Sequence, residues 1–254
     1  MSASQPTQQD AKEKFVAVNG YWTDAWDKVL GSAPDFFADC VDLMAAPGKI
    51  GRLDAKVTAL IHIAVNVACT HLNEAETRLH IRRALALGVR AEEIGEAIQL
   101  VSVLGIHSCN IGVPMMVEEA RAAGVVGELG NGEFDAPRQA LKEAFIRQRG
   151  YWSPLWDDVL RLSPEFFESY TRFSTAPLRS DALSPKLREL IYIAIDIATQ
   201  HLFEPGTRVH LINALKHGAS VLEILQVIET VSLIGLQSVS TGYAILAEEL
   251  AARD

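Results

Sequence analysis

The strongest constraint on the fold is an internal repeat. When the sequence is compared with itself, residues 21–119 align with residues 151–249 without an insertion. The aligned positions share Tyr-Trp, Phe-Phe, His-Leu and Arg-x-His elements at identical spacing. The two copies are 151 − 21 = 130 residues apart, and a unit of that length is too long for a solenoid repeat. The chain therefore holds two copies of one domain-sized unit.

The repeat divides the 254 residues into four segments. We assign residues 1–19 to a polar N-terminal segment and residues 20–123 to the first repeat. Residues 124–149 are assigned to a linker with the start of the next helix, and residues 150–254 to the second repeat. With 49% hydrophobic residues, a chain of this length can bury a sizeable core.

Both copies show the periodicity of helices. Apolar residues recur at i, i+3, i+4, i+7, i+8 and i+11 in both copies: Val57, Leu60, Ile61, Ala64, Val65 and Ala68, and Leu187, Leu190, Ile191, Ala194, Ile195 and Ala198. No strand-like alternation competes with this pattern, so we predict an all-α fold. Apolar faces this broad predict that the two copies pack on each other and that the exposed remainder forms an oligomer.

Residues that commonly begin and end helices stand at the expected positions. Ser163 and Ser184 each precede a proline, which predicts an N-cap followed by proline in the first helical position. The Ser220-x-x-Glu223 element is a capping box, and Gly88 and Gly218 are placed where helices end.

Composition and charge exclude several classes of function. The formal net charge is −9 and no basic run is present, which argues against nucleic-acid or anionic-membrane binding. The N-terminus lacks a signal-peptide pattern, and Asp196 interrupts the most apolar stretch, so we expect no transmembrane segment. The cysteines, Cys40, Cys69 and Cys109, form no Cys-x-x-Cys pair. We therefore expect neither disulfides nor a cysteine zinc site, and a reducing, cytoplasmic location.

Two histidines in each copy need partners. His71 and His201 follow the apolar stripe, and His80 and His210 come nine residues later, after a predicted corner. A reversal of the chain at that corner could bring the members of each pair together. Each histidine could be a core residue bonded to a backbone carbonyl, or a proton donor or acceptor in a reaction. The residues alone leave both interpretations open.

Arginine and tryptophan are the candidate binding residues. Arg78 and Arg208 lie two residues before a histidine, where a guanidinium could clamp a carboxylate or form a surface ion pair. Trp22 and Trp152, each with a second tryptophan four residues on, could form the wall of an apolar pocket or anchor the packing.

One carboxylate breaks the repeat. Glu189 is matched by Ala59 in the first copy and lies on the helix face opposite the apolar stripe, which favours a solvated charge. The histidine pairs, with Glu74 or Glu204, could supply metal ligands, but the spacing matches no established metal motif. We therefore predict no metal.

Residues 77–94 contain the pattern Arg-x-His-x-x-x-Ala-Leu-x-x-Gly, and residues 208–218 repeat it. This pattern resembles the signature of the carboxymuconolactone decarboxylase family, which is related to the alkylhydroperoxidase AhpD. The resemblance implies all-helical units that assemble into rings of six, so a tandem chain is expected to form a homotrimer with pseudo-sixfold symmetry. The peroxidase branch uses a glutamate, a Cys-x-x-Cys pair and a histidine, of which Glu189 and His210 look like the first and last. The cysteine pair between them is missing.

The decarboxylase branch of the family needs no cofactor, only carboxylate binding and a proton for the developing dienolate. The resemblance therefore implies a cofactor-independent lyase acting on a small carboxylate or lactone substrate of aromatic-acid catabolism. In this hypothesis His80 and His210 are the acid/base groups, assisted by His71 and His201, and Glu189 tunes the second site. Arg78, Arg208, Trp22 and Trp152 would bind the substrate. The alternatives are a peroxidase with a degenerate thiol site at Cys69 and a non-catalytic small-molecule-binding assembly.

Overall fold

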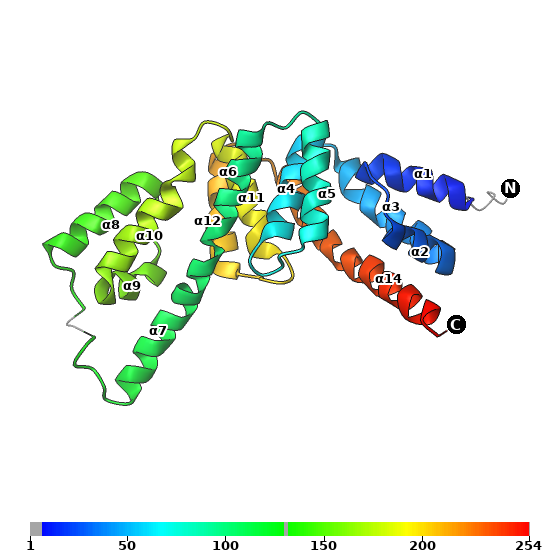
Figure 1. The fold of residues 1–254 in the computed structure, drawn as a ribbon. Coiled ribbons are helices and arrows are strands. Elements are labelled where there is room, and N and C mark those ends of the chain that lie inside the picture. The colour runs from blue at the N-terminus through cyan, green and yellow to red at the C-terminus, as the bar shows by residue number, and fades with distance from the viewer. Residues whose placement is uncertain (1–6, 130–131, 254) are drawn as a thin grey trace. The chain divides into compact units, whose positions relative to one another are not determined.

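The computed structural model describes residues 7–129 and 132–253. These residues form helices and connecting turns, without a strand among them, which confirms the predicted all-α fold (Figure 1). Of the polar N-terminal segment, residues 1–6 lie outside the described residues. Residues 8–19 of that segment form the first helix.

Contacts divide the chain into a larger unit, Met1–Val101 with Ser184–Asp254, and a smaller unit, Ser102–Leu183. The larger unit contains α1 (Gln8–Asn19), α2 (Asp24–Ser32), α3 (Pro34–Ile50), α4 (Ala55–Val67), α5 (Glu74–Ala86), α6 (Ala91–Val101), α11 (Pro185–Ile197), α12 (Glu204–Lys216), α13 (Val221–Ser232), η4 (Leu233–Leu236) and α14 (Gln237–Ala251). The smaller unit contains η1 (Ser102–Ile106), α7 (His107–Ala122), α8 (Ala136–Arg149), η2 (Pro154–Trp156), α9 (Asp157–Leu162), α10 (Pro164–Thr175) and η3 (Pro177–Arg179). Each unit therefore combines helices from both sequence copies.

The sequence repeat is reproduced helix by helix. Helices α4 and α11 begin and end at matched positions of the two copies, as do α5 and α12. The turns between them match as well: Leu72 and Leu202 both have positive φ, at 49° and 50°. Because the backbones agree this closely, side chains at matched positions of the two copies can be compared directly.

Helices α4 and α11 form the centre of the larger unit. Helix α4 contacts α5, α6, α11 and α13, and α11 contacts α12, α6 and α13. With neighbours on every side, residues off the apolar stripe, such as Ala59, Asn66 and Asp196, are at most 1% exposed. The contact between α4 and α11 confirms that the two copies pack on each other.

The last helix of each copy packs with the first helices of the other copy. In the larger unit α14 contacts α2, and in the smaller unit α7 contacts α9 and η2. Each of these assemblies has a buried phenylalanine at its centre, Phe15 in one and Phe145 in the other. Phe15 contacts the rings of Tyr21, Trp22, Trp26 and Phe37 at centroid distances of 5.1–5.9 Å. Burial of a ring of this size stabilises the fold by about 3 kcal/mol.

The predicted caps are mostly confirmed. Ser184 accepts a hydrogen bond from the backbone N–H of Leu187, and Ser220 and Glu223 form the capping box. Gly88 and Gly218 end their helices at φ values of +78° and +82°. Ser163 precedes α10 as predicted, but its side chain makes no capping bond.

Two helical stretches, 91–122 and 221–251, are long and apolar enough to cross a bilayer by length and composition. They contain polar residues between the apolar ones, so a search for uninterrupted apolar runs does not identify them. Core helices pass the same test, and each stretch contains a 3₁₀ turn where α6 meets α7 or α13 meets α14. Length and composition therefore do not place either stretch in a membrane.

Candidate functional site

A cavity of about 320 Å³ lies inside the larger unit. This volume is within the range of roughly 300–1,000 Å³ that is typical of small-molecule sites. Helices from both sequence copies line it. The polar lining side chains are Asn19, Tyr21, Thr58, His62, Asn66, Glu76, His80, Arg83, Gln226, Thr230 and Gln237. The cavity therefore combines an apolar wall with a group of titratable side chains.

His80 is the most buried of the predicted acid/base residues, at 3% exposure. Its ring stacks on the ring of His62 at a centroid distance of 4.4 Å and an interplanar angle of 5°. The Nε2 atom of His80 lies 3.6 Å from the carboxylate of Glu76, which accepts a hydrogen bond from the Tyr21 hydroxyl at 3.4 Å. The Nδ1 atom of His80 is buried and has no hydrogen-bond partner among the described residues.

Burial sets the protonation of the neighbours of His80. It lowers the pKa of His62 well below the ordinary value, and the charges of His80 and Arg83 lower it further. His62 is therefore neutral near pH 7. Burial also raises the pKa of Tyr21, with a smaller contribution from the charge of Glu76, so the Tyr21 hydroxyl keeps its proton. Of this group, His80 is the histidine suited to carry a proton to a ligand.

His71 belongs to a network that crosses the two copies. Asn66 donates from Nδ2 to the carbonyl of His62, so its Oδ1 accepts from Nε2 of Gln237. The Oε1 atom of Gln237 then accepts from Nδ2 of Asn73 and lies 2.7 Å from Nε2 of His71. Because this oxygen cannot donate, Nε2 of His71 must carry a hydrogen. His71 is thus a donor to Gln237, and no hydrogen bond or ring contact joins it to His80 in the part of the chain that the structure describes.

In the second copy the matched histidine has a different partner. Nδ1 of His210 lies 2.7 Å from the carboxylate of Glu189, and both side chains are mostly buried, with exposures of 13% and 15%. Tyr192 takes the place of His62 and stacks on His210, again at 4.4 Å. The structure therefore brings Glu189 and His210 together. It does not show the solvated Glu189 that the helix periodicity favoured.

A second carboxylate lies on the other side of His210. Oδ2 of Asp196 is 4.0 Å from Nε2 of His210. Burial raises the pKa of Asp196 to about 7, with His210 lowering and Glu189 raising it. A Cβ atom on Gly206 would collide with Asp196 Oδ2, so only glycine leaves room for this carboxyl group.

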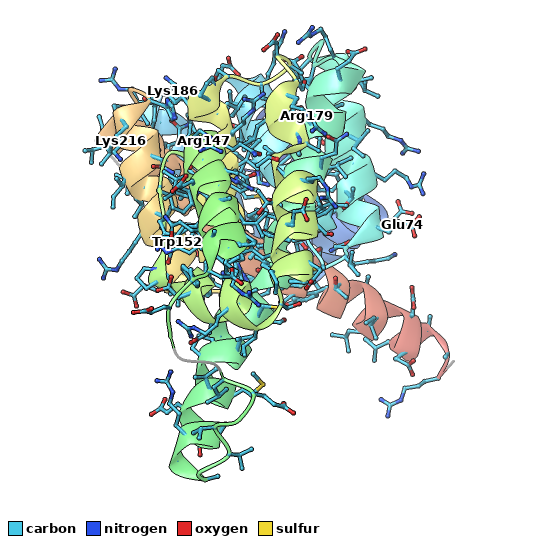
Figure 2. The ribbon with its side chains drawn as sticks, turned by 90° about the vertical axis from the view of Figure 1, so that its left-hand side faces the viewer. Glu74, Arg147, Trp152, Arg179, Lys186 and Lys216 are labelled. Atoms are coloured by element: carbon cyan, nitrogen blue, oxygen red, sulfur yellow. The ribbon has the colours of Figure 1, made fainter. Side chains whose placement is uncertain are left out.

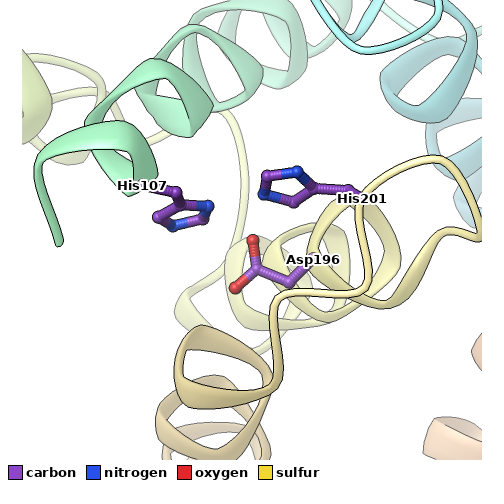
Figure 3. A group of neighbouring side chains, drawn as sticks. All are labelled: His107, Asp196 and His201. Atoms are coloured by element: carbon purple, nitrogen blue, oxygen red, sulfur yellow. The ribbon is translucent and has the colours of Figure 1, made fainter. Parts of the chain in front are cut away.

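His201 follows Asp196 after the end of α11 (Figure 3). Burial lowers the pKa of His201, so this ring is neutral near pH 7. A ring nitrogen of His201 and a carboxylate oxygen of Asp196 lie within 4.8 Å of each other. The third residue drawn, His107, is the first residue of α7 and belongs to the smaller unit.

The two predicted arginine clamps lie at the surface. Arg78 pairs with Glu74 and Arg208 with Glu204, each one helical turn away, and the arginine side chains are 59% and 73% exposed. Glu74 points outward from the helices (Figure 2). The ion-pair interpretation is therefore the one the structure shows. Arg83, on the same helix as Arg78, lines the cavity instead and donates to the carbonyl of Val18.

The predicted tryptophans serve the packing of the aromatic clusters. Trp22 packs edge-on against Phe15, with the Lys12 ammonium 4.3 Å from the centre of its ring. Trp152 packs in the same way on Phe145 in the smaller unit. In the first copy it is Trp26, four residues after Trp22, that lines the cavity.

The cysteines are all free thiols. Cys40 is buried, and burial raises the pKa of its thiol, which disfavours the reactive thiolate. Cys69 is exposed in the turn after α4, where the second copy has a threonine. This arrangement offers no redox pair of the kind that peroxidase chemistry of the AhpD type needs.

Sequence reasoning missed His62, Glu76, Arg83 and Gln237. His62, Arg83 and Gln237 are not repeated at the matched positions, where Tyr192, Asn213 and His107 stand, so the repeat gave them no weight. The useful signal was helical spacing. Glu76, His80 and Arg83 follow each other at i, i+4 and i+7, and therefore share one face of α5.

Comparison with known proteins agrees with this architecture. The family model described as "Carboxymuconolactone decarboxylase family" matches residues 34–106 and 164–248. A crystal structure from Burkholderia xenovorans LB400, described as a "putative gamma-carboxymuconolactone decarboxylase subunit", is 35% identical with a TM-score of 0.94. The match covers 98% of this chain and 100% of that chain. No curated protein matches the sequence. The two matched segments and the shared helical fold show that this chain belongs to the carboxymuconolactone decarboxylase family.

Proposed function

We propose that this protein is a cofactor-independent carbon–carbon lyase that removes CO2 from a small lactone carboxylic acid of the carboxymuconolactone type. Family membership supports this class of reaction. The observation that carries the proposal is that the buried His80 lines a cavity of substrate size, with one ring nitrogen facing Glu76 and the other without a partner among the described residues.

The reaction needs a proton at a particular place. When the bond between the lactone ring and its carboxylate breaks, CO2 leaves and the electron pair enters the unsaturated lactone as a dienolate. A ring N–H of His80 then delivers a proton to a carbon of this dienolate, and solvent restores the proton. The Glu76 carboxylate lies 3.6 Å from Nε2 of His80 and is the acidic group nearest to this ring in the cavity.

The cavity supplies one cation for an anionic substrate. Arg83 lines the cavity and is the arginine there, whereas the exposed Arg78 is held by Glu74. A guanidinium in a partly buried site binds a carboxylate more strongly than it does in water. Arg83 therefore takes over the substrate-binding role that we expected of Arg78.

The first test is absorbance-followed turnover of 4-carboxymuconolactone by the purified full chain. His80→Asn is expected to lower kcat by about 10²–10⁴, the usual contribution of a general acid. His210→Asn tests the second copy in the same assay, and the double variant tests both. His217→Gln is the control, because this histidine is exposed at the end of α12. Full activity in the double variant would refute the assignment.

The second test compares two adjacent arginines of α5. Arg83→Gln is expected to raise KM at least tenfold, because the variant loses the cavity's cation. Arg82→Gln, at an exposed position one residue earlier, is expected to leave KM within a factor of two. Melting temperatures show whether loss of the bond from Arg83 to the Val18 carbonyl also weakens the fold.

We also propose that the chain assembles as a homotrimer. The solved relative is described as a subunit, and large apolar side chains such as Leu43, Leu85 and Ile212 are more than half exposed here. Exposed apolar surface of this kind favours subunit contacts. Light scattering is expected to give about three times the chain mass of 27.7 kDa.

A further inference from the structure

One amide on the wall of the cavity is held in a single orientation. Gln226 of α13 is 2% exposed and lines the cavity. Its Oε1 atom accepts hydrogen bonds from the backbone N–H groups of Arg52 and Leu53, each at 2.9 Å, in the turn between α3 and α4. An amide nitrogen accepts no hydrogen bond, so the two backbone donors identify which end of the side chain is the oxygen. The NH2 group of Gln226 is therefore the end that the turn does not hold.

This NH2 group has two hydrogens and no acceptor among the described residues. The partnerless polar atoms that protein encloses completely include both side-chain atoms of Gln200 but not Nε2 of Gln226. Nε2 of Gln226 thus keeps accessible surface, and a side chain this buried has that surface at the cavity wall. Because a buried donor without an acceptor is costly, the cavity favours a ligand with an oxygen at this place.

The other neutral polar groups of the wall have fewer hydrogens to offer. Each of the hydroxyl groups donates its one hydrogen within the protein: Tyr21 to the Glu76 carboxylate, and Thr58 and Thr230 to the backbone carbonyl four residues earlier. Gln237 gives one of its two amide hydrogens to Asn66. Gln226 therefore has more hydrogens available for a ligand than these neighbours have.

At the matched positions of the two copies the protein satisfies its own side chains. Glu96 is matched to Gln226, and Arg188 is matched to Thr58. Nε of Arg188 donates to the Glu96 carboxylate at 2.5 Å, and both residues are buried. Thr58 and Gln226 make no hydrogen bond to each other in the described part of the chain. At the cavity, the position of the ion pair is thus taken by two neutral residues, and one of them keeps its donors for a ligand.

We propose that Nε2 of Gln226 donates a hydrogen bond to the carbonyl oxygen of the substrate's lactone. This inference rests on the proposed function, because it concerns the oxygen that becomes charged in that reaction. When the bond to the leaving carboxylate breaks, CO2 departs and the electron pair moves through the ring double bond onto this oxygen. A ring N–H of His80 then protonates a ring carbon, and the pair returns to form the new C–H bond. A fixed donor binds the charged oxygen of the dienolate more strongly than the neutral carbonyl, which lowers the barrier.

The two ends of the substrate then meet different helices. In 4-carboxymuconolactone both carboxylates project from one ring carbon, and the carbonyl oxygen projects from another. Arg83 of α5, in the first copy, is the cation available for a carboxylate, and Gln226 of α13, in the second copy, is the neutral donor for the carbonyl. The cavity therefore orients the lactone with side chains from both copies.

The test compares two replacements that both remove the donor. Gln226→Glu keeps the size of the side chain and an acceptor for the two backbone N–H groups, which stabilise its carboxylate, but it adds a charge. Gln226→Met is neutral but leaves the turn without its acceptor. Both are expected to lower kcat for 4-carboxymuconolactone about 10²–10³-fold, the usual loss for one oxyanion donor. Gln148→Glu, at an exposed position of α8, is the control for the same substitution and is expected to leave kcat unchanged.

A second measurement does not depend on turnover. The probe is muconolactone, the same lactone without the carboxylate that leaves, labelled with ¹³C at the carbonyl. Its infrared C=O band is expected to move to lower frequency when it binds the wild-type chain, because a hydrogen bond weakens the C=O bond. In either variant the band of the bound probe is expected to stay near its free position.

The outcomes separate the two proposals. Loss of kcat in Gln226→Met alone indicates support of the turn, and loss in Gln226→Glu alone indicates an effect of charge, so either result would overturn the inference. An unshifted band in the wild type, a shift that persists in the variants, or no binding of muconolactone would overturn it as well. If the band shifts only in the wild type and 4-carboxymuconolactone is not consumed, the Gln226 donor stands and the proposed reaction fails. If both variants keep wild-type kcat, the reaction stands and the Gln226 donor fails. The infrared comparison with Gln226→Glu decides the question where Gln226→Met does not fold.

Discussion

Replacing Asp196 by asparagine should make the protein more stable at neutral and alkaline pH. Asp196 is 1% exposed, and burial raises its pKa from 3.8 to about 7. The folded state therefore binds this proton more tightly than the unfolded state does between those two pH values. The contribution of this proton to the free energy of unfolding is fully present below pH 3.8 and is lost as the pH rises to about 7. Over about 3 pH units, at 1.36 kcal/mol each, the loss is about 4 kcal/mol.

The asparagine variant has no such proton to lose, so its advantage over the wild type grows with pH. The matched Asn66 shows that an amide is accommodated, because it donates to the carbonyl one turn earlier. Urea unfolding is expected to show the Asp196→Asn advantage about 3 kcal/mol larger at pH 8 than at pH 5. The exposed Asp181→Asn serves as control, with changes within about 0.5 kcal/mol at both pH values. An advantage that is the same at both pH values would refute the reasoning.

Three further substitutions test the packing. The Arg188 guanidinium lies 2.5 Å from the Glu96 carboxylate, and its side chain is 11% exposed. Glu96→Ala removes that carboxylate and is expected to lower the free energy of unfolding by about 3–5 kcal/mol, measured in urea. Gly206→Ala drives a methyl group into the Asp196 carboxyl and should lower stability by about 1–3 kcal/mol, with partial recovery when Asp196→Ala is added. Phe15→Ala empties the centre of an aromatic cluster and is expected to cost about 3–5 kcal/mol, measured by the same unfolding assay.

Most of the fold follows from local sequence signals. The apolar stripe beginning at Val57 and the cap residues Ser184 and Ser220 predict helices whose bounds the structure reproduces. These signals are local, because helical hydrogen bonds and caps join residues a few positions apart. The pairing of each last helix with the first helices of the other copy was not predicted. It depends on which apolar faces meet, and many faces in this chain have similar composition.

The site was predictable only where its residues are repeated. His80 and His210 stand out because the same residue recurs at the same register. Helical periodicity predicts a solvated Glu189 because it identifies one apolar face, whereas α11 is buried on nearly all sides. Burial of that kind depends on the number of neighbouring helices, which a single helix does not encode.

Gln237 shows that a residue of the site need not be repeated in the other copy. It reaches His71 from a distant part of the sequence and completes the cavity of the first copy with an atom of the second. Its matched residue is His107, so the repeat marks this position as one where the copies have diverged. Divergence at positions 59, 62, 66, 76, 83 and 237 changes the partners of His80 without moving its backbone. A duplicated chain can thus keep the same backbone in both copies while the two matched histidines have different partners: Glu76 and His62 beside His80, and Glu189 and Tyr192 beside His210.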